Sequence, residues 1–388
     1  MDLLEVIRLA AQRGASDIHV AAGQPVVLRV RGELSLLDAG AAVTPASAEA
    51  IARAVLTAEE WLHWKQQGSA DKALTLEGVR CRVNVLRSAG AVGLAVRLLP
   101  GDEVTLASLN LHPDLASLIE PEHGLVLVSG PTGCGKSSTL AALVQEVNRT
   151  REAHIVTIEQ PVEFALRPDK SFIRQREVGH DTPSFEQGLL DATREDIDVL
   201  MVGEMRDRET MRLTLDACET GHLVLATVHS ATVVEALQRI VSAFPAQEQA
   251  SVGAQLADVL VAVVSQRLVW LDDPGLRVPE CEILRATTAV RAVLRQGQFF
   301  KLPMLMDTGA KSGMWTLLRY REWIEHHAGW VLPAPPAAAG PPPRAARAPA
   351  PPAPPARLAG ETSSGRDDVI VIEPPEGKIS DILSELDP

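Results

Sequence analysis

The stretch Gly130-Pro131-Thr132-Gly133-Cys134-Gly135-Lys136-Ser137 decides the fold of this chain. It matches G-x-x-x-x-G-K-[ST], the phosphate-binding loop of NTPases. The apolar run 125–128 before it predicts a buried strand, and residues 138–144 after it predict a helix. Glycines let backbone N–H groups surround phosphate oxygens, and a helix N-terminus attracts anions. This strand–loop–helix context favours a phosphate loop over a glycine turn that matches by chance.

The residue types in this loop indicate a nucleoside triphosphate and Mg²⁺ as the cofactors. Lys136 is expected to neutralise the β- and γ-phosphates, and the Ser137 hydroxyl is expected to ligate Mg²⁺. The Cys134 side chain is expected to fill space, with a redox role as the alternative. The predicted nucleotide-binding residues are Gly130, Thr132, Gly133, Cys134, Gly135, Lys136, Ser137 and Ser138.

Composition restricts the class of protein. The 388 residues are enough for two domains and a tail, and 46% of them are hydrophobic, as in globular proteins. The net charge of −13 disfavours a nucleic acid as the main partner, because such proteins are usually basic. The four cysteines are scattered without a Cys-x-x-Cys pair, which indicates a reducing compartment. The N-terminus does not resemble a signal peptide, and the apolar run 259–264 is too short to span a bilayer. We therefore expect a cytoplasmic protein.

The chain divides into regions of different pattern. An opening helix and three alternating segments predict a small α+β domain, and a later alternation of apolar strands and helices predicts an α/β domain with a largely parallel sheet. In that second domain the strands after the phosphate loop are expected at 155–158, 199–202 and 223–227. The predicted divisions are an N-terminal domain (1–98), an interdomain linker (99–117), an ATPase domain (118–300) and a helical C-terminal segment (301–331).

The last part of the sequence has a different composition. Residues 332–366 are mostly Pro, Ala and Arg, which predicts a disordered tether. Residues 367–388 form an acidic peptide with Ile379, Ile382, Leu383 and Leu386 on one helical face. This end is interpreted either as a solvated extension or as a docking peptide for a partner protein.

Acidic residues follow two of the expected strands, at the sheet edge where ligands of parallel sheets bind. Glu204 follows strand 199–202 and occupies the Walker B place of a Mg²⁺ ligand. Glu163 follows strand 155–158 in Glu159-Gln160-Pro161-Val162-Glu163 and is a candidate to orient or deprotonate water. In isolation such carboxylates are often solvated loop residues, but two clusters downstream of a phosphate loop favour function.

Two histidines bracket the strand 223–227. They are His222, just before it, and His229, just after it. A lone histidine is usually structural, whereas His229 in this place is expected to sense the γ-phosphate or to contact Glu204.

The motifs taken together resemble those of the secretion ATPase superfamily, and most closely the PilT-like retraction ATPases of type IV pili. The resemblance covers about residues 1–300. The resemblance is specific because the order, the spacing and the residues of the whole set of motifs agree with the family pattern. Besides the phosphate loop, the motifs are Gly-Ala-Ser-Asp-Ile-His (14–19), Arg-Val-Asn (82–84), Thr-Ile-Glu-Gln-Pro-Val-Glu-Phe (157–164), Gln-Arg-Glu-Val (175–178), Arg-Glu-Asp-Ile-Asp-Val-Leu-Met-Val-Gly-Glu-Met-Arg-Asp (194–207) and Glu-Thr-Gly-His-Leu (219–223).

The resemblance implies a PAS-like N-terminal domain, a RecA-like ATPase domain and a homo-hexameric ring. It implies that ATP hydrolysis drives pilus retraction and twitching motility, that an inner-membrane platform protein is the partner, and that the ring reaches the cytoplasmic face of the membrane only through partners. By position, Glu163 matches the catalytic glutamate, Glu204 the Walker B glutamate, and His222 and His229 the histidine box. Arg82 and Arg97 match arginines near the nucleotide at the subunit interface. Arg239 matches a recurrent arginine, for which a structural ion pair is an equal alternative.

Two departures from the family pattern keep other functions open. Gln160 replaces the aspartate of the usual Glu-Asp-Pro box, and Ala289–Arg295 only partly repeats a signature tied to retraction. An accessory or regulatory paralogue with weak or no hydrolysis is therefore an alternative. Pilus-assembly or type II secretion ATPases are another, although their four-cysteine zinc insertion and additional N-terminal domain are not recognisable here. A RecA-fold DNA motor is disfavoured by the acidic charge.

Overall fold

A computed structural model describes residues 3–30, 32–37, 42–99 and 104–332. The predicted tether and acidic peptide therefore lie outside the described residues, apart from Leu332. Among the described helices, none is both long and apolar enough to cross a membrane.

The N-terminal part is a six-stranded antiparallel sheet with the order β3-β2-β1-β6-β5-β4. Helix α3 begins with a capping box, in which Thr57 and Glu60 exchange side-chain and backbone hydrogen bonds. A separate apolar core that includes Ile7, Ile18 and Trp61 packs between the sheet and its helices. The elements are α1 (Leu3–Gln12), β1 (Ala15–Ala21), β2 (Val27–Val30), β3 (Glu33–Leu36), α2 (Pro45–Val55), α3 (Ala58–Gln67), β4 (Ser69–Leu76), β5 (Val79–Ser88) and β6 (Ala91–Leu98).

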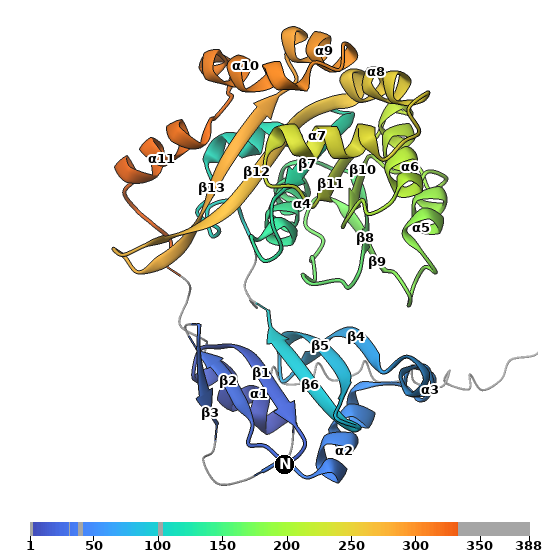
Figure 1. Ribbon diagram of the computed structural model, residues 1–388, viewed down its shortest axis with the longest axis vertical. Helices are drawn as coiled ribbons and strands as arrows, with labels where there is room; N and C mark the ends of the chain where they lie inside the picture. Colours follow the sequence, from blue (N-terminus) through green and yellow to red (C-terminus); the bar gives the residue numbers. More distant parts are fainter. Residues whose placement is uncertain (1–2, 31, 38–41, 100–103, 333–388) are drawn as a thin grey trace, which may run out of the picture. The chain divides into compact units, whose positions relative to one another are not determined.

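The second part is a seven-stranded sheet with the order β13-β12-β7-β11-β10-β8-β9. All neighbours pair in parallel except β12 and β13, so the predicted α/β fold with a largely parallel sheet is confirmed. Figure 1 shows the helices on the two sides of this sheet. The elements are η1 (Pro113–Ile119), β7 (Gly124–Ser129), α4 (Lys136–Thr150), β8 (His154–Glu159), β9 (Phe172–Glu177), α5 (Phe185–Ala192), β10 (Val199–Val202), α6 (Arg208–Glu219), β11 (Leu223–Val228), α7 (Val233–Ser242), α8 (Gln249–Val259), β12 (Leu260–Leu271), β13 (Leu276–Arg285), α9 (Thr288–Arg295), η2 (Phe299–Lys301), α10 (Leu302–Thr308), η3 (Ala310–Ser312) and α11 (Leu317–His326).

Two apolar cores flank the central strands. One is built largely from the helices α5 to α10, and the other from α4, η1 and α11. Strands β7, β10 and β11 are buried along their whole length, which explains their continuous apolar sequences.

The described part of the predicted linker 99–117 packs into the second of these cores. Val104, Leu106, Leu111 and Leu115 are all buried there, together with apolar residues of α4. From residue 104 onward this segment therefore contributes to the stability of the ATPase part, in addition to joining it to the N-terminal strands.

Candidate nucleotide-binding site

The loop 130–135 runs from the end of β7 to the start of α4, and its glycines meet a geometric requirement. A Cβ atom on Gly130, where φ is +149°, would lie 2.3 Å from the backbone oxygen of Gln266 and 2.5 Å from the Cys134 Sγ atom. Gly133 and Gly135 have φ values of +79° and +88°, which favour glycine. The glycines of the motif are therefore needed both for the turn and for the close approach of the loop to β12.

Gln266 on β12 holds this loop and was not predicted from the sequence. Its side chain is buried, and its Nε2 atom donates to the Cys134 carbonyl at 2.6 Å. Its Oε1 atom accepts from the Thr139 hydroxyl on α4 at 2.8 Å. One amide thus joins the loop to the helix that follows it. The available signal was a polar pair, Ser265-Gln266, interrupting an apolar strand.

Lys136, the first residue of α4, is buried at the centre of the site. Its Nζ atom donates to the carbonyl oxygens of Gly130 (2.9 Å) and Pro131 (3.1 Å) and lies 3.2 Å from His229 Nδ1. Burial is the main influence on the Lys136 ammonium and lowers its pKa, against the opposing effects of Cys134 and Glu204. A partly dehydrated ammonium at a helix N-terminus attracts a phosphate oxygen strongly.

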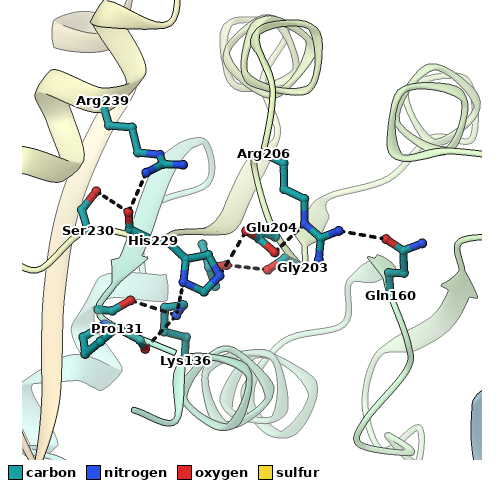
Figure 2. Close-up of polar contacts among 11 residues, drawn as sticks. Pro131, Lys136, Gln160, Gly203, Glu204, Arg206, His229, Ser230 and Arg239 are labelled. Carbon is teal, nitrogen blue, oxygen red and sulfur yellow. Dashed lines mark hydrogen bonds and ion pairs between the residues drawn. The ribbon is translucent and has the colours of Figure 1, made fainter. Parts of the chain in front are cut away.

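His229 connects Lys136 to Glu204, as Figure 2 shows. His229 Nε2 lies 3.1 Å from Glu204 Oε1. Burial, reinforced by the positive charge of Lys136, lowers the pKa of His229, so the neutral ring is favoured. Because Nδ1 faces an ammonium donor, the ring proton is assigned to Nε2, which donates to Glu204. The expected contact between His229 and Glu204 is present.

Glu204 has a second partner on its other oxygen. Arg206 Nε donates to Glu204 Oε2 at 2.7 Å, and Arg206 Nη1 donates to Gln160 Oε1 at 3.4 Å (Figure 2). Gln160, the departure from the family box, therefore accepts a hydrogen bond where an aspartate would compete with Glu204 for the guanidinium charge.

The His229 backbone is fixed from two sides. Arg239 Nη1 donates to the His229 carbonyl at 3.1 Å, and the Ser230 hydroxyl donates to the same oxygen at 2.8 Å. Ser265 on β12 donates to the Ala231 carbonyl at 3.0 Å. Arg239 thus holds the loop after β11 through a hydrogen bond to the backbone. From the sequence, a structural ion pair was one alternative for this residue.

The other predicted residues fall in different places. Thr132 is exposed in the loop, and Ser137 and Ser138 are the partly exposed second and third residues of α4. His222 lies at the opposite end of β11 from His229, where its Nδ1 atom contacts the Thr220 hydroxyl and the Ala217 carbonyl. His222 therefore stabilises the turn between α6 and β11.

Glu163 lies in the loop that follows β8. Its Oε1 atom is 3.3 Å from Arg82 Nη1, and Arg80 Nη2 donates to the Val162 carbonyl at 2.7 Å. Arg97 is the cross-strand neighbour of Arg82, but its Nε atom donates to Asp17 at 2.9 Å. Of the two predicted arginines, Arg82 is thus the one beside Glu163.

The donor set fits the expected metal. The Glu204 carboxylate and the Ser137 hydroxyl are hard oxygen donors, which Mg²⁺ takes together with substrate phosphates. Together with the phosphate loop at the carboxyl edge of a parallel sheet, they define the class of protein as a P-loop nucleotide-binding protein.

Comparisons with known proteins place the chain within this class. The type II/IV secretion system protein family matches residues 2–297. The chain is 39% identical over 330 residues to the uncharacterized protein YggR of Escherichia coli, covering 85% of this chain and 99% of that protein. It is 37% identical over 318 residues to the type IV pilus retraction ATPase PilT of Pseudomonas aeruginosa, covering 82% of this chain and 92% of that protein. A crystal structure of the pilus retraction motor PilT with bound ADP superimposes with a TM-score of 0.74 at 37% identity, covering 83% of this chain and 96% of that one. The chain belongs to the type II/IV secretion system protein family.

Proposed function

We propose that this protein is an ATPase motor of the type IV pilus machinery that hydrolyses ATP to drive pilus retraction. The observation that carries the proposal is the continuous contact from Lys136 through His229 to Glu204 behind a phosphate loop. These three side chains meet at one edge of the sheet, where we propose that Lys136 binds phosphate, His229 senses the γ-phosphate and Glu204 holds Mg²⁺. The retraction role is supported by the similarity to PilT.

Each residue has a defined task in the proposed reaction. Lys136 and the loop N–H groups bind the phosphates, and Ser137 and Glu204 would hold Mg²⁺, which neutralises developing phosphate charge when bound. Glu163 orients the attacking water and accepts its proton. Arg82 supplies positive charge beside Glu163. Arg97 is proposed to act from a neighbouring subunit, for which it must leave Asp17.

The proposed assembly is a homo-hexameric ring in the cytoplasm, with a PAS-like N-terminal domain and a RecA-like ATPase domain in each subunit. The ring is proposed to act on an inner-membrane platform protein, and the peptide 367–388 to dock a further protein. Sedimentation of the purified chain with ATP and Mg²⁺ tests the ring. The expected result is a particle with six times the mass of the monomer. A monomer at every nucleotide and protein concentration would contradict it.

A deletion strain tests the direction of the motor. Loss of the gene is expected to leave excess, immobile surface pili and no twitching. Complementation with the wild-type chain is expected to restore motility, and complementation with Glu163→Gln is not. Cells without pili after the deletion would instead indicate an assembly ATPase.

A second function, that of an accessory paralogue with weak hydrolysis, is favoured by one observation. Arg206 donates to Glu204 at 2.7 Å while Gln160 offers the guanidinium no competing charge, so the carboxylate that is to ligate the metal is already partly neutralised by a cation. If the cell has another retraction ATPase, deleting that ATPase while this protein stays present separates the two roles. An accessory paralogue is expected not to support twitching by itself, whereas a main motor is.

A further inference from the structure

The loop that carries Glu163 is fastened to strand β9 by one side chain, that of Gln175. Gln175 Oε1 accepts a hydrogen bond from the Leu166 backbone N–H at 2.8 Å. Gln175 Nε2 donates to the Phe164 carbonyl at 2.8 Å. A single amide thus satisfies one donor and one acceptor of the loop backbone just after Glu163.

The same amide reaches a buried carboxyl group. Gln175 Nε2 lies 3.1 Å from Glu159 Oε1, and the Thr157 hydroxyl donates to that oxygen at 2.7 Å. Glu159 is the last residue of β8 and is 6% exposed. Thr157 and Gln175 are register partners in the parallel β8–β9 pair, so the contact is built into the sheet.

The loop is also held on the other side of Glu163. Glu177 Oε2 accepts from the Val162 N–H at 3.1 Å, and the Val178 N–H donates to the Glu159 carbonyl at 2.8 Å. Strand β9 therefore fixes the backbone on both sides of the residue that is to orient water.

We propose that Gln175 and Glu159 are positioning residues for hydrolysis, which hold the Glu163 loop against β9. This inference rests on the proposed function, in which Glu163 orients the attacking water. A displacement of about 1 Å in a positioned group can cost two orders of magnitude in rate, so a fixed loop matters.

The surroundings of Glu159 act on its pKa in opposite directions. Burial raises its pKa to about 7, and the nearby charge of Glu163 adds to this effect, whereas hydrogen bonds from Thr157, Gln175 and the Glu163 backbone oppose it. The charged groups on the neighbouring elements include Glu163 in the next loop, Arg174, Arg176 and Glu177 on β9, and the Glu204–Arg206 pair after β10.

Ionisation of Glu159 therefore adds a negative charge to a group of acids at a site for a polyphosphate. This charge repels the phosphates, so we expect MgATP to be used less efficiently above about pH 7, although a carboxylate accepts the hydrogen bonds that hold the loop at least as strongly as the neutral group does.

Two measurements on the purified full-length chain test the role of Gln175. The first is phosphate release with binding of a fluorescent ATP analogue, and the second is hydrogen exchange over residues 160–166. Gln175→Ala is expected to lower kcat roughly ten- to hundredfold with analogue affinity changed by no more than about twofold, and to lose protection of the Leu166 N–H. Arg174→Ala is the matched control, because Arg174 lies on the same strand, is half exposed and contacts Glu195 instead of the loop.

Unchanged kcat in a folded Gln175→Ala protein, or unchanged protection at Leu166, overturns the inference. A wild-type protein that releases no phosphate contradicts the proposed function, and hydrogen exchange still decides whether Gln175 fastens the loop. If Gln175→Ala does not fold, Gln175→Glu replaces it. That variant keeps an acceptor for Leu166, but its carboxylate cannot donate to Phe164. Its activity is therefore expected to fall at pH 8 and to recover at pH 6, where the protonated carboxyl group can donate again.

The pH profile tests Glu159 separately. Glu159→Gln keeps an oxygen acceptor for Thr157 and Gln175 but cannot ionise. Wild-type kcat/KM for MgATP is expected to fall above about pH 7, and the variant is expected to lack this fall. An identical alkaline fall in both proteins assigns the ionisation to another group and overturns the role of Glu159.

Discussion

Replacing Gln266 by alanine tests how the phosphate loop is held. In the wild-type chain this amide donates to the Cys134 carbonyl at 2.6 Å and accepts from the Thr139 hydroxyl at 2.8 Å. Both partners belong to buried residues, so water replaces the amide poorly. The substitution therefore removes the direct link between the loop, α4 and β12.

The magnitude follows from the two groups left without a partner. A buried donor or acceptor that loses its hydrogen bond costs about 1–3 kcal/mol. Two such neighbours give a loss of about 2–5 kcal/mol in the free energy of unfolding, because effects at adjacent groups do not add fully. The loop should also lose order, which weakens nucleotide binding.

Urea denaturation and titration with a fluorescent ATP analogue measure both effects. Gln255→Ala is the matched control, because Gln255 is a partly exposed glutamine on α8 that donates to Asp216 and Glu219 at 3.0 Å. That surface change should alter stability by less than about 1 kcal/mol. A Gln266→Ala protein no less stable than Gln255→Ala, with wild-type affinity, would refute the reasoning.

Three further predictions concern the loop, the metal site and pH. Gly130→Ala should destabilise the protein by at least about 2 kcal/mol, because the new Cβ would lie 2.3 Å from a backbone oxygen of β12. Gly133→Ala, with φ of +79° and open space, should cost about 1–2 kcal/mol, and equal melting temperatures would contradict this ranking. Gln160→Asp should draw the guanidinium of Arg206 from the Walker B carboxylate and lower the Mg²⁺ concentration for half-maximal ATPase activity, and a rise would contradict this reasoning. Because burial raises the pKa of Glu159 from 4.5 to about 7, the unfolded state loses this proton first, so stability should fall between these pH values by about 3 kcal/mol. Glu159→Gln should remove that fall in denaturation curves measured at pH 5 and pH 8.

The strands around the phosphate loop were predictable because their sequences are continuously apolar. The expected runs 125–128, 155–158, 199–202 and 223–227 all lie inside observed strands. Buried parallel strands have no solvated face, so local composition identifies them. Strand β9 was missed because it is an edge strand with alternating polar residues, and β12 because its apolar half gives way to Ser265-Gln266-Arg267.

The site residues that follow strands were predictable, whereas the hydrogen bonds that join them to residues distant in sequence were not. Lys136, Glu204 and His229 each follow a strand, and parallel strands bring such ends to one edge. Gln266, Arg206 and Gln175 were not singled out, because their roles depend on hydrogen bonds to residues distant in sequence. Gln266, for example, is 132 positions from its partner Cys134. Such a contact requires the sheet order, which no local pattern supplies.

Phosphate release by the purified oligomer with ATP and Mg²⁺ tests the central claim most directly. The wild-type chain is predicted to turn over. Glu163→Gln is predicted to bind ATP normally and to release phosphate about 10²–10⁴-fold more slowly, as expected when a general base is removed. Lys136→Ala is predicted to lose binding or turnover. Undiminished phosphate release by the Glu163→Gln protein, or no nucleotide binding by the wild-type oligomer, would contradict the account.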